Sequence, residues 1–502
     1  MAYPAASTRR GPLHGLAGRG VALPGAQQPY RRRRTRRASV DRRQPDDLRA
    51  AAHRGAAVSG TAGFPSFAEA LRVWFRIGCL SFGGPAGQIA LMHREVVDER
   101  RWVSDARFLH ALNFCTLLPG PEATQLATYL GWLLHGVKGG VAAGLLFVLP
   151  GAAVMLALSA IYVAFGEVPL IAGLFYGLKC AVLVLVVEAL LRVAKRALKG
   201  RVPWVVAFLA FATLFLLNLP FPAVVLAAGL AGYLAPAAFF GGGHGTAKDG
   251  PPALLDALLA AEPGRIARLT GAARRAGLLA LVLWVWPVML LIGTPVWGDV
   301  AWFFSKMAVV TFGGAYAVLA YVAQEAVEHY RWLSAGQMLA GLGLAETTPG
   351  PLILVLQFVG YLAGHAQGGF WGGVLGALLT LWVTFAPCFA WIFLGAPYVE
   401  RLHDAARLKG ALAGVTAAVV GVIANLAVWF GLRVLFGAMW EVPIGPARLE
   451  VPILASIDPV AVLLAMLAAV CLFRMRMDVV KTLGIAALAG LVLRTAFGWL
   501  LG

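Results

Sequence analysis

The chain has 502 residues, of which 60% are hydrophobic and only 13% are charged, and its mean hydropathy is +0.77. A water-soluble protein of this length needs far more polar surface, so the composition excludes a soluble globular protein and predicts one that is embedded in a lipid bilayer. The formal net charge of +18 is concentrated at the N-terminus, where thirteen arginines and three aspartates within residues 1–60 account for +10.

Residues 1–60 come first in chain order. They are rich in Arg, Pro, Gly and Ala, which predicts a disordered tail. The arginine run at 31–37 resembles a nucleic-acid patch, but a cytoplasmic tail near anionic lipid, or a misassigned start codon, explains it better. We therefore expect no nucleic-acid partner. No apolar run follows the arginines closely, so the tail is not a secretory signal.

An internal repeat is the most informative feature of the sequence. Ser81-Phe82-Gly83-Gly84 recurs in the second half of the chain as Thr311-Phe312-Gly313-Gly314. The same offset relates Pro119-Gly120-Pro121 to Pro349-Gly350-Pro351. Two related halves are typical of transporters, which hold the substrate between the halves near the middle of the membrane. Duplication without transport is the alternative.

The first repeat is expected over residues 67–239. Its Gly and Pro breaks predict two re-entrant hairpins, at 67–92 and 108–135, because the pieces on either side of each break are too short to span a bilayer. Four full spans are expected near residues 140–165, 168–191, 203–219 and 221–239. Short, broken segments at membrane depth are the best sequence indication of a transporter binding site. Ordinary spans that are merely kinked at the breaks are the alternative.

The second repeat is expected over residues 299–502, after a cytoplasmic linker at 240–276 and a connecting transmembrane helix at 277–298. Its hairpins are expected at 301–322 and 337–365, and its full spans near 369–395, 410–436, 457–473 and 482–500. Equivalent loops differ in charge: residues 93–107 hold four arginines, and residues 323–335 hold one. Because cytoplasmic loops gather Lys and Arg, we expect the second repeat to be inverted.

The predicted fold class is therefore an all-α polytopic membrane protein with two inverted-topology repeats. Each repeat has about six membrane segments, counting a hairpin as one, and a connecting helix brings the total to about 13. The N-terminus is expected in the cytoplasm and the C-terminus outside. The sequence leaves the oligomeric state open, with a homodimer as one expectation.

Four stretches of the first half carry a resemblance to a known family. They are the FGGP-bearing stretch Phe75–Pro85, the acidic stretch ending in Trp102, LLPGPE at Leu117–Glu122, and FVLPG at Phe147–Gly151. These motifs, with their second copies, resemble the chromate transporter family over roughly residues 67–493. The resemblance implies a bacterial plasma-membrane protein that exports chromate from the cytoplasm, driven by the proton gradient, and so gives chromate resistance. Family members have also been linked to sulfate, a tetrahedral dianion of similar size.

The residues themselves favour a site for such an anion. A tetrahedral dianion needs N–H or O–H donors and positive potential, and broken helices supply free N–H groups at their positive ends. The predicted oxyanion-binding residues are Arg76, Ser81, Phe82, Gly83, Gly84, Pro85, Gln88, Pro119, Gly120, Pro121, Gln125, Lys179, Lys306, Thr311, Phe312, Gly313, Gly314, Thr347, Thr348, Pro349, Gly350 and Pro351.

Three cations fall within apolar segments. Arg76 aligns with Lys306, so a cation recurs in both halves, and Lys179 is the third. Charges inside a membrane are functional candidates by default. The alternative is that they reach the interface or pair with a carboxylate.

Carboxylates next to the PGP motifs are candidates for proton coupling. Glu122 follows the first motif and Glu346 precedes the second, so the two are not equivalent by the repeat. Glu95 and Glu325 are equivalent, and pairing with a nearby arginine or capping is the favoured interpretation for both. Glu188 is expected to pair with Arg192.

Other function classes lack the motifs that they need. The sequence has no HExxH, no GxSxG, no CxxC and no GxxxxGK[ST], which argues against an enzyme, a metal site, a cofactor and an ATP-driven pump. We expect the substrate oxyanion, chromate or sulfate, together with protons and lipid as partners, beside the homodimer noted above. A sulfate or other oxyanion importer or exchanger is the closest alternative; a membrane-embedded enzyme and a non-transporting scaffold are more distant ones.

Overall fold

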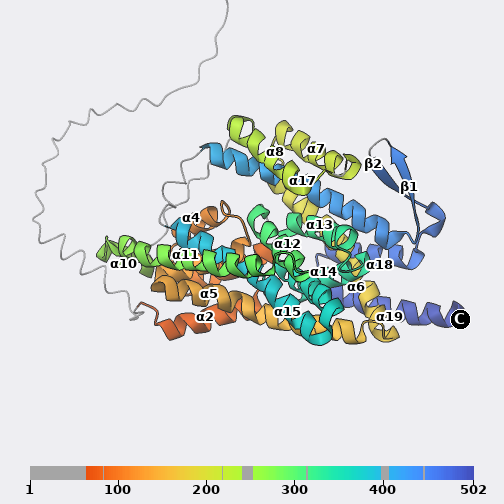
Figure 1. Cartoon of the computed structure of the whole chain (residues 1–502), viewed down its shortest axis with the longest axis horizontal. Coiled ribbons are helices and arrows are strands. Elements are labelled where there is room, and N and C mark those ends of the chain that lie inside the picture. The colour runs from red at the N-terminus through yellow and green to blue at the C-terminus, as the bar shows by residue number, and fades with distance from the viewer. Residues whose placement is uncertain are drawn as a thin grey trace, which may run out of the picture. The chain divides into compact units, whose positions relative to one another are not determined.

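The computed structural model describes residues 64–82, 84–217, 219–239, 253–312, 315–396, 406–444 and 447–501. Outside these ranges lie the predicted tail at 1–60, residues 240–252 of the predicted linker, and the predicted site residues Gly83, Gly313 and Gly314. The described chain is helical almost throughout (Figure 1), with one described hairpin of strands, β1 (Met439–Ile444) and β2 (Ala447–Pro452). An all-α polytopic membrane fold is therefore confirmed.

The helices of the first half and the linker run as follows in chain order: α2 (Phe67–Leu80), α3 (Gly84–His93), the π-helix η1 (Arg94–Glu99), α4 (Asp105–Cys115), α5 (Glu122–Phe165), α6 (Pro169–Ala197), α7 (Arg201–Leu217), α8 (Phe221–Leu234), α9 (Pro236–Phe239), α10 (Leu254–Ala261) and α11 (Arg265–Leu291). Helix α11 was predicted to begin near residue 277, and in the structure it starts within the predicted linker.

The helices of the second half are α12 (Trp297–Val310), α13 (Ala315–Gln324), η2 (Glu325–His329), α14 (Ala335–Thr347), η3 (Leu352–Leu354), α15 (Val355–Gly395), α17 (Ala406–Leu435), η5 (Leu454–Ser456), α18 (Pro459–Ala469), η6 (Val470–Arg474) and α19 (Val479–Leu501). The order of elements from α2 to α5 recurs from α12 to α15. Even the backbone repeats, because Arg101 and Arg331, which the repeat makes equivalent, both adopt a positive φ, of 51° and 52°.

Five helical segments of the described chain are long and apolar enough to cross a bilayer: α5, α6, α11, α17 and the stretch Leu352–Gly395. Helices α7 and α8 have 17 and 14 residues, which makes them about 26 and 21 Å long at 1.5 Å per residue. The hydrocarbon core is about 30 Å thick. The span expected near 203–219 keeps its expected length but begins two residues earlier. The span expected near 221–239 is shorter than predicted, because Pro236 disfavours helix at Ala235, where α8 ends.

Helices α5 and α15 each fold back on themselves at a glycine. Gly136 and Gly369 have φ values of 65° and 57°, which L-residues rarely adopt. A Cβ atom added to Gly139 would lie 2.3 Å from the Gly131 carbonyl oxygen, so the two arms of α5 pack backbone against backbone. Gly372 meets Gly364 in the same way in α15. Small residues permit this close approach between helices in a membrane.

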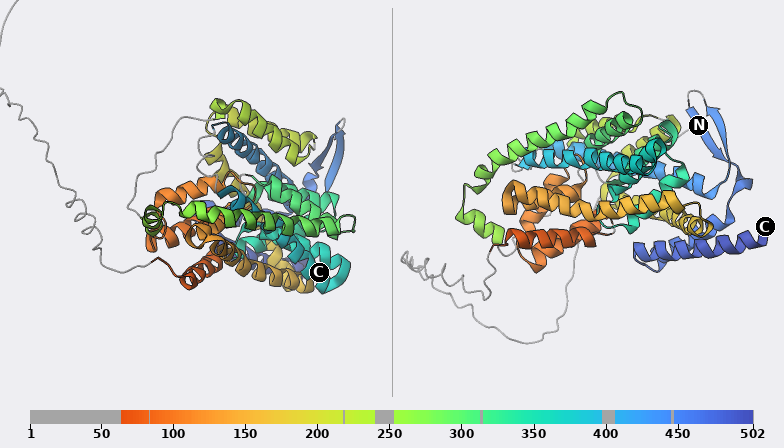
Figure 2. Two further views of the ribbon diagram at one scale, coloured as in Figure 1. Left: turned by 60° about the vertical axis from the view of Figure 1, so that its left-hand side comes forward. Right: turned by 60° about the horizontal axis from the view of Figure 1, so that its bottom comes forward.

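The last helices of each half pack against the other half. Helices α18 and α19 lie against α6, whereas α7 and α8 lie against α17 (Figure 1). Glycines mark both contacts: a Cβ atom at Gly177 would lie 1.9 Å from the Ala486 carbonyl oxygen, and one at Gly414 would lie 2.2 Å from that of Ala228. Figure 2 shows α19 alongside α6 from another side. The two halves are therefore interlocked.

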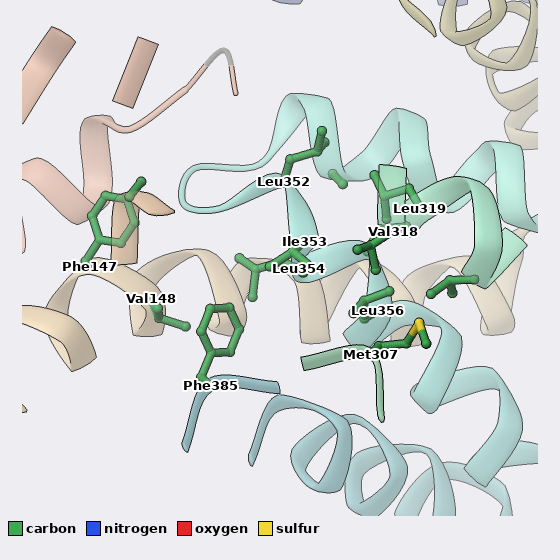
Figure 3. Close-up of a cluster of buried hydrophobic side chains, with 14 of the residues drawn as sticks. Phe147, Val148, Met307, Val318, Leu319, Leu352, Ile353, Leu354, Leu356 and Phe385 are labelled. Atoms are coloured by element: carbon green, nitrogen blue, oxygen red, sulfur yellow. The ribbon is translucent and has the colours of Figure 1, made fainter. Parts of the chain in front are cut away.

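The buried core is shared between the halves around the motif breaks. Figure 3 shows a cluster of apolar side chains from α5, α12, α13, η3 and α15. Its labelled members are Phe147, Val148, Met307, Val318, Leu319, Leu352, Ile353, Leu354, Leu356 and Phe385, each no more than 6% exposed. This packing holds the broken segments of both halves in contact.

Candidate functional site

The two kinds of broken motif meet crosswise between the halves. The Gly120 N–H donates to the Thr311 carbonyl oxygen at 2.8 Å, and the Gly350 N–H donates to the Ser81 carbonyl oxygen at 2.8 Å. The two bonds are equivalent by the sequence repeat, because its offset relates Gly120 to Gly350 and Ser81 to Thr311. Each PGP turn thus binds the (S/T)FGG break of the opposite half. We call this contact of Ser81, Gly120, Thr311 and Gly350 the crossing.

Local sequence explains why the backbone is free to make these bonds. Proline on either side of each glycine has no N–H and ends the helix there, which leaves backbone groups without helical partners. Gly120 and Gly350 have φ values of 118° and 91°, where glycine alone is unstrained. A Cβ atom at Gly120 would lie 3.0 Å from Gln125 Nε2 and 3.1 Å from Cys388 Sγ. The crossing therefore requires glycine for both conformation and space.

Polar side chains surround the crossing. Gln88 Nε2 donates to the Gly350 carbonyl oxygen at 2.6 Å, and Gln125 Nε2 donates to the Pro119 carbonyl oxygen at 2.6 Å. The Ser81 hydroxyl is fully buried and has no hydrogen-bond partner among the residues that the structure describes. A buried hydroxyl of this kind is an available donor at the contact between the halves.

A small cavity lies at the crossing. It has a volume of about 20 Å³ and is lined by residues that include Pro85, Gln88, Gly120, Glu122 and Thr311. This volume accommodates about one water molecule, and a tetrahedral oxyanion is larger. The cavity at the crossing is therefore too small for a tetrahedral oxyanion in this conformation.

A larger cavity extends from the crossing toward the C-terminal end of α6. We call it the arginine cavity; it has a volume of about 330 Å³ and is lined by Glu122, Arg192, Arg196 and Tyr316 among others. It shares Pro85 and Glu122 with the small cavity. Beyond it lies a wider mouth of about 880 Å³, which shares Arg192 and Arg196 and adds Lys195, Arg476 and Asp478. The three cavities thus adjoin one another in series, from the wide mouth to the crossing, and we call this series the route.

The two predicted proton-coupling carboxylates converge on this route. Glu122 lines both cavities, and Glu346, which is buried, accepts a hydrogen bond of 2.6 Å from the Tyr316 hydroxyl. Tyr316 itself lines the arginine cavity. Arg196 interacts electrostatically with Glu122, and Arg192 with Glu346. The structure therefore brings together two carboxylates that the repeat does not relate.

Lys179 lies in a different cavity, which we call the lysine cavity. It has a volume of about 650 Å³ and is lined by Tyr162, Glu167, Lys179, Trp332, Ser334 and His365 among others. Lys179 and Arg196 both belong to α6 and are about 25 Å apart along it, at 1.5 Å per residue. The two cavities therefore lie toward opposite ends of one long helix.

The other predicted cations do not line these cavities. The Arg76 side chain pairs with the buried carboxylate of Glu95, with 3.5 Å between Nε and Oε1. Glu95 also pairs with Arg100 at 2.5 Å, as predicted. Lys306 Nζ lies 3.4 Å from the Tyr321 hydroxyl and 5.6 Å from the centre of the Phe303 ring. Arg76 and Lys306 thus occupy local contacts, each within its own half.

The remaining predicted residues within the described ranges lie at or near the crossing. Those that its hydrogen bonds and cavity bring together are Ser81, Pro85, Gln88, Pro119, Gly120, Pro121, Gln125, Thr311, Gly350 and Pro351. Thr347 and Thr348 sit at the end of α14 and donate their hydroxyls to the Leu344 carbonyl oxygen. The Pro349 carbonyl packs on Gly151, Gly84 begins α3, and Phe82 and Phe312 flank the breaks.

Sequence reasoning missed Arg192, Arg196 and Tyr316 as lining residues. Glu188 does pair with Arg192, at 3.0 Å between Oε1 and Nε, as predicted. The basic run at the end of α6, which contains Arg192, Lys195 and Arg196, was given no site role from the sequence. Its four-residue spacing, which places Arg192 and Arg196 on one helical face, was the signal that could have indicated a lined cavity.

Comparison with known proteins decides the family. The chain matches the family model described as chromate transporter over residues 68–233 and 298–491. It belongs to the chromate transporter family. The two matched regions begin one residue inside α2 and α12, so each contains one complete set of broken motifs of this family member. No solved structure matches the chain.

Individual relatives agree with the family assignment. This family member is 34% identical to the chromate transport protein of Pseudomonas aeruginosa over 369 residues, which covers 71% of the chain and 79% of the relative. It is 28% identical to the chromate transport protein of Cupriavidus metallidurans, with coverage of 72% and 81%. It is 26% identical to the probable chromate transport protein of Synechococcus elongatus, with coverage of 73% and 85%. The predicted resemblance is confirmed, and the family model and these relatives are named for transport.

Proposed function

We propose that this protein is a secondary active transporter that exports chromate from the bacterial cytoplasm, is driven by the proton gradient, and so gives chromate resistance. The observation that carries the proposal is the crossing: two reciprocal backbone hydrogen bonds close the contact at which the arginine cavity ends. The printed names of the relatives, chromate transport proteins, support the choice of substrate.

The proposed topology is a pair of inverted repeats joined by α11. It is supported by the matching element order, by the exchange of terminal helices, and by the two cavities toward opposite ends of α6. With about 13 membrane segments, counting hairpins as one, the N-terminus lies in the cytoplasm and the C-terminus outside. The arginine cavity then faces the cytoplasm and the lysine cavity faces outward, because Lys and Arg accumulate on the cytoplasmic side.

Separation of the crossing supplies the donors that an oxyanion needs. When the motifs part, the Gly120 and Gly350 N–H groups lose their carbonyl acceptors and can donate to the oxygens of the ion. The buried Ser81 hydroxyl, which has no partner among the described residues, adds a third donor. Each backbone hydrogen bond contributes about 1 kcal/mol net, so the two together cost about 2 kcal/mol to exchange. Binding of the ion offsets a cost of this size.

Proton coupling is assigned to Glu122 and Glu346. Glu122 stands where the arginine cavity meets the crossing, so its charge state changes the potential on the path of the ion. Glu346 is connected to the same cavity through Tyr316. A proton that arrives from outside neutralises these carboxylates, and their deprotonation toward the cytoplasm restores the starting state.

The test is uptake of radiolabelled chromate into inverted membrane vesicles that contain the protein and are acidified inside. We expect accumulation that collapses when a protonophore is added and that is lost in Glu122→Gln. Vesicles that accumulate neither chromate nor sulfate would overturn the proposal. Accumulation that is unaffected by the protonophore and by Glu122→Gln would overturn the proton coupling while leaving transport.

Sulfate transport is the second candidate. The donors at the crossing are backbone N–H groups and a hydroxyl, which recognise the tetrahedral shape and charge of an anion and not its central atom. Unlabelled sulfate is therefore expected to compete with chromate in the same vesicles. Transport of sulfate without transport of chromate would transfer the substrate assignment to sulfate.

A further inference from the structure

The last turns of α6 carry a basic cluster that the proposed path does not yet use. Arg192 and Arg196 line both the arginine cavity and its mouth, and Lys195 lines the mouth. The spacing of four residues places the two arginines on one face of the helix, one turn apart. Both arginines therefore line the same cavity next to the crossing.

The two arginines differ in their partners. Arg192 is held by Glu188, with 3.0 Å between Nε and Oε1. Arg196 makes no hydrogen bond and no ion pair with any residue in the described ranges, and Glu122 lines the same cavity. A guanidinium has five N–H donors, so Arg196 retains unused donors directed at a cavity.

The counterpart of Arg196 in the second half is neutralised. Gly173 and Gly177 of α6 correspond to Gly410 and Gly414 of α17, because each pair packs on the terminal helices of the other half. The offset that relates these glycines carries Arg196 onto Arg433. Arg433 pairs with Glu328 at 3.1 Å and with Glu450 at 2.8 Å, and it lies 4.2 Å from the centre of the Trp429 ring.

We propose that Arg196, assisted by Arg192, is a capture site for a tetrahedral dianion in the arginine cavity. The inference rests on the proposed function and deepens it, because it places a first binding step ahead of the crossing. Guanidinium groups bind two oxygens of such an anion at once. The negative end of the α6 dipole stabilises the arginines and not the anion, so binding depends on the guanidinium groups themselves.

Charge in the cavities supports this assignment. The carboxylates that line the arginine cavity and its mouth are Glu122, Glu188 and Asp478, and the cations are Arg192, Lys195, Arg196 and Arg476. The cations exceed the carboxylates even when every carboxylate is ionised. At the counterpart position, by contrast, two carboxylates surround one arginine. The capture site is therefore built at one end of the path only.

The phosphate of a lipid headgroup has the same chemistry as a free oxyanion, so the test must separate the two. The full chain is reconstituted into nanodiscs of phosphatidylcholine alone, and binding of radiolabelled sulfate and of chromate is measured at equilibrium. Three proteins are compared: wild type, Arg196→Gln, and Arg433→Gln as the matched control from the other half. Size-exclusion profiles verify that the variants are folded.

We expect Arg196→Gln to weaken binding of both anions about tenfold or more, because charge-assisted hydrogen bonds are lost. Arg433→Gln should stay within about twofold of wild type, since its arginine is already neutralised. Equal binding by wild type and Arg196→Gln would overturn the capture site, as would equal losses in the two variants. A lipid site would replace the capture site under two joint results. The protein would retain phosphatidylglycerol only when Arg196 is present, and it would bind no oxyanion in phosphatidylcholine nanodiscs.

The capture site and the proposed function fail in different ways. Arg196-dependent binding by a protein that transports no oxyanion in vesicles would leave the capture site standing and refute export. Transport by Arg196→Gln with an unchanged KM for chromate would refute the capture site and leave export standing. A raised KM for chromate in Arg196→Gln would support both the capture site and export, because loss of a first binding step lowers occupancy at low substrate concentration.

Discussion

The glycine of the first PGP motif offers the sharpest test of the crossing. Gly120→Ala places a methyl group on a residue with a φ of 118°, which strains the backbone by about 1–2 kcal/mol. It also brings the new Cβ atom to 3.0 Å from Gln125 Nε2 and 3.1 Å from Cys388 Sγ. Crowding at these distances displaces the turn and weakens its hydrogen bond to Thr311, which costs about 1 kcal/mol more.

A matched control separates the crossing from backbone strain. Gly200 has a φ of 123°, but a Cβ atom added there meets nothing nearer than Pro203 Cδ at 3.9 Å. Gly200→Ala therefore carries the strain without the crowding. We expect the free energy of unfolding to fall by about 2–3 kcal/mol in Gly120→Ala and by about 1–2 kcal/mol in Gly200→Ala.

The assay is thermal unfolding of both variants and wild type in one detergent at one scan rate, followed by tryptophan fluorescence. Because membrane proteins commonly unfold irreversibly, apparent Tm values are compared only within this set. A lower apparent Tm for Gly120→Ala than for Gly200→Ala supports the crossing as a packed contact. Equal decreases would refute the reasoning, since strain alone would then account for both variants.

Three further predictions concern the interlocked helices, the linker and the carboxylates. Gly177→Ala should destabilise the protein strongly because its Cβ atom would lie 1.9 Å from the Ala486 carbonyl oxygen, whereas Gly484→Ala, with nothing within 4 Å, should raise or retain the apparent Tm. Partial burial raises the pKa of Asp256, but hydrogen bonds from Arg107, Ser104 and Ala253 outweigh burial and hold this pKa below its usual range. The contribution of Asp256 to the docking of α10 is therefore fully present above the unfolded pKa and is lost as the pH falls through the lower folded pKa. Asp256→Asn should speed hydrogen exchange in α10 at neutral pH, and unchanged exchange would contradict this role. Tyr316→Phe should reduce proton-driven chromate uptake less than Glu346→Gln does, because it removes a hydrogen bond and leaves the carboxylate.

Much of the architecture was predictable because it is local or repeated in the sequence. The FGG and PGP breaks are visible as residues that cannot continue a helix. The constant offset between the two copies then identifies which segments are equivalent, and the structure places breaks at both copies. The pairing of Glu188 with Arg192 was predictable for the same reason, since a separation of four residues fixes their proximity on a helix.

What could not be predicted depends on contacts between distant segments. Nothing local specifies that Gly120 bonds to Thr311 of the other half, because the partner carbonyl is chosen by the packing of both halves. The exchange of terminal helices is likewise specified by glycines, such as Gly177 and Gly414, whose partners lie in another part of the chain. Arg76 was a candidate because it falls in an apolar segment, yet the fold places Glu95 beside it.

The positions of Glu122 and Glu346 make the two repeated halves of the protein unequal in charge. By the repeat, Glu122 corresponds to Leu352 and Glu346 to Thr116, so each half has one carboxylate at a position that its counterpart lacks. The crosswise contact of the halves nevertheless brings both toward the arginine cavity, which Thr116 also lines. Arg196, which makes no ion pair with a described residue, lines the same cavity, while its counterpart Arg433 is neutralised. The repeat thus accounts for the two reciprocal hydrogen bonds of the crossing, and the unequal placement of charge accounts for the side from which we propose that an anion and a proton act on it.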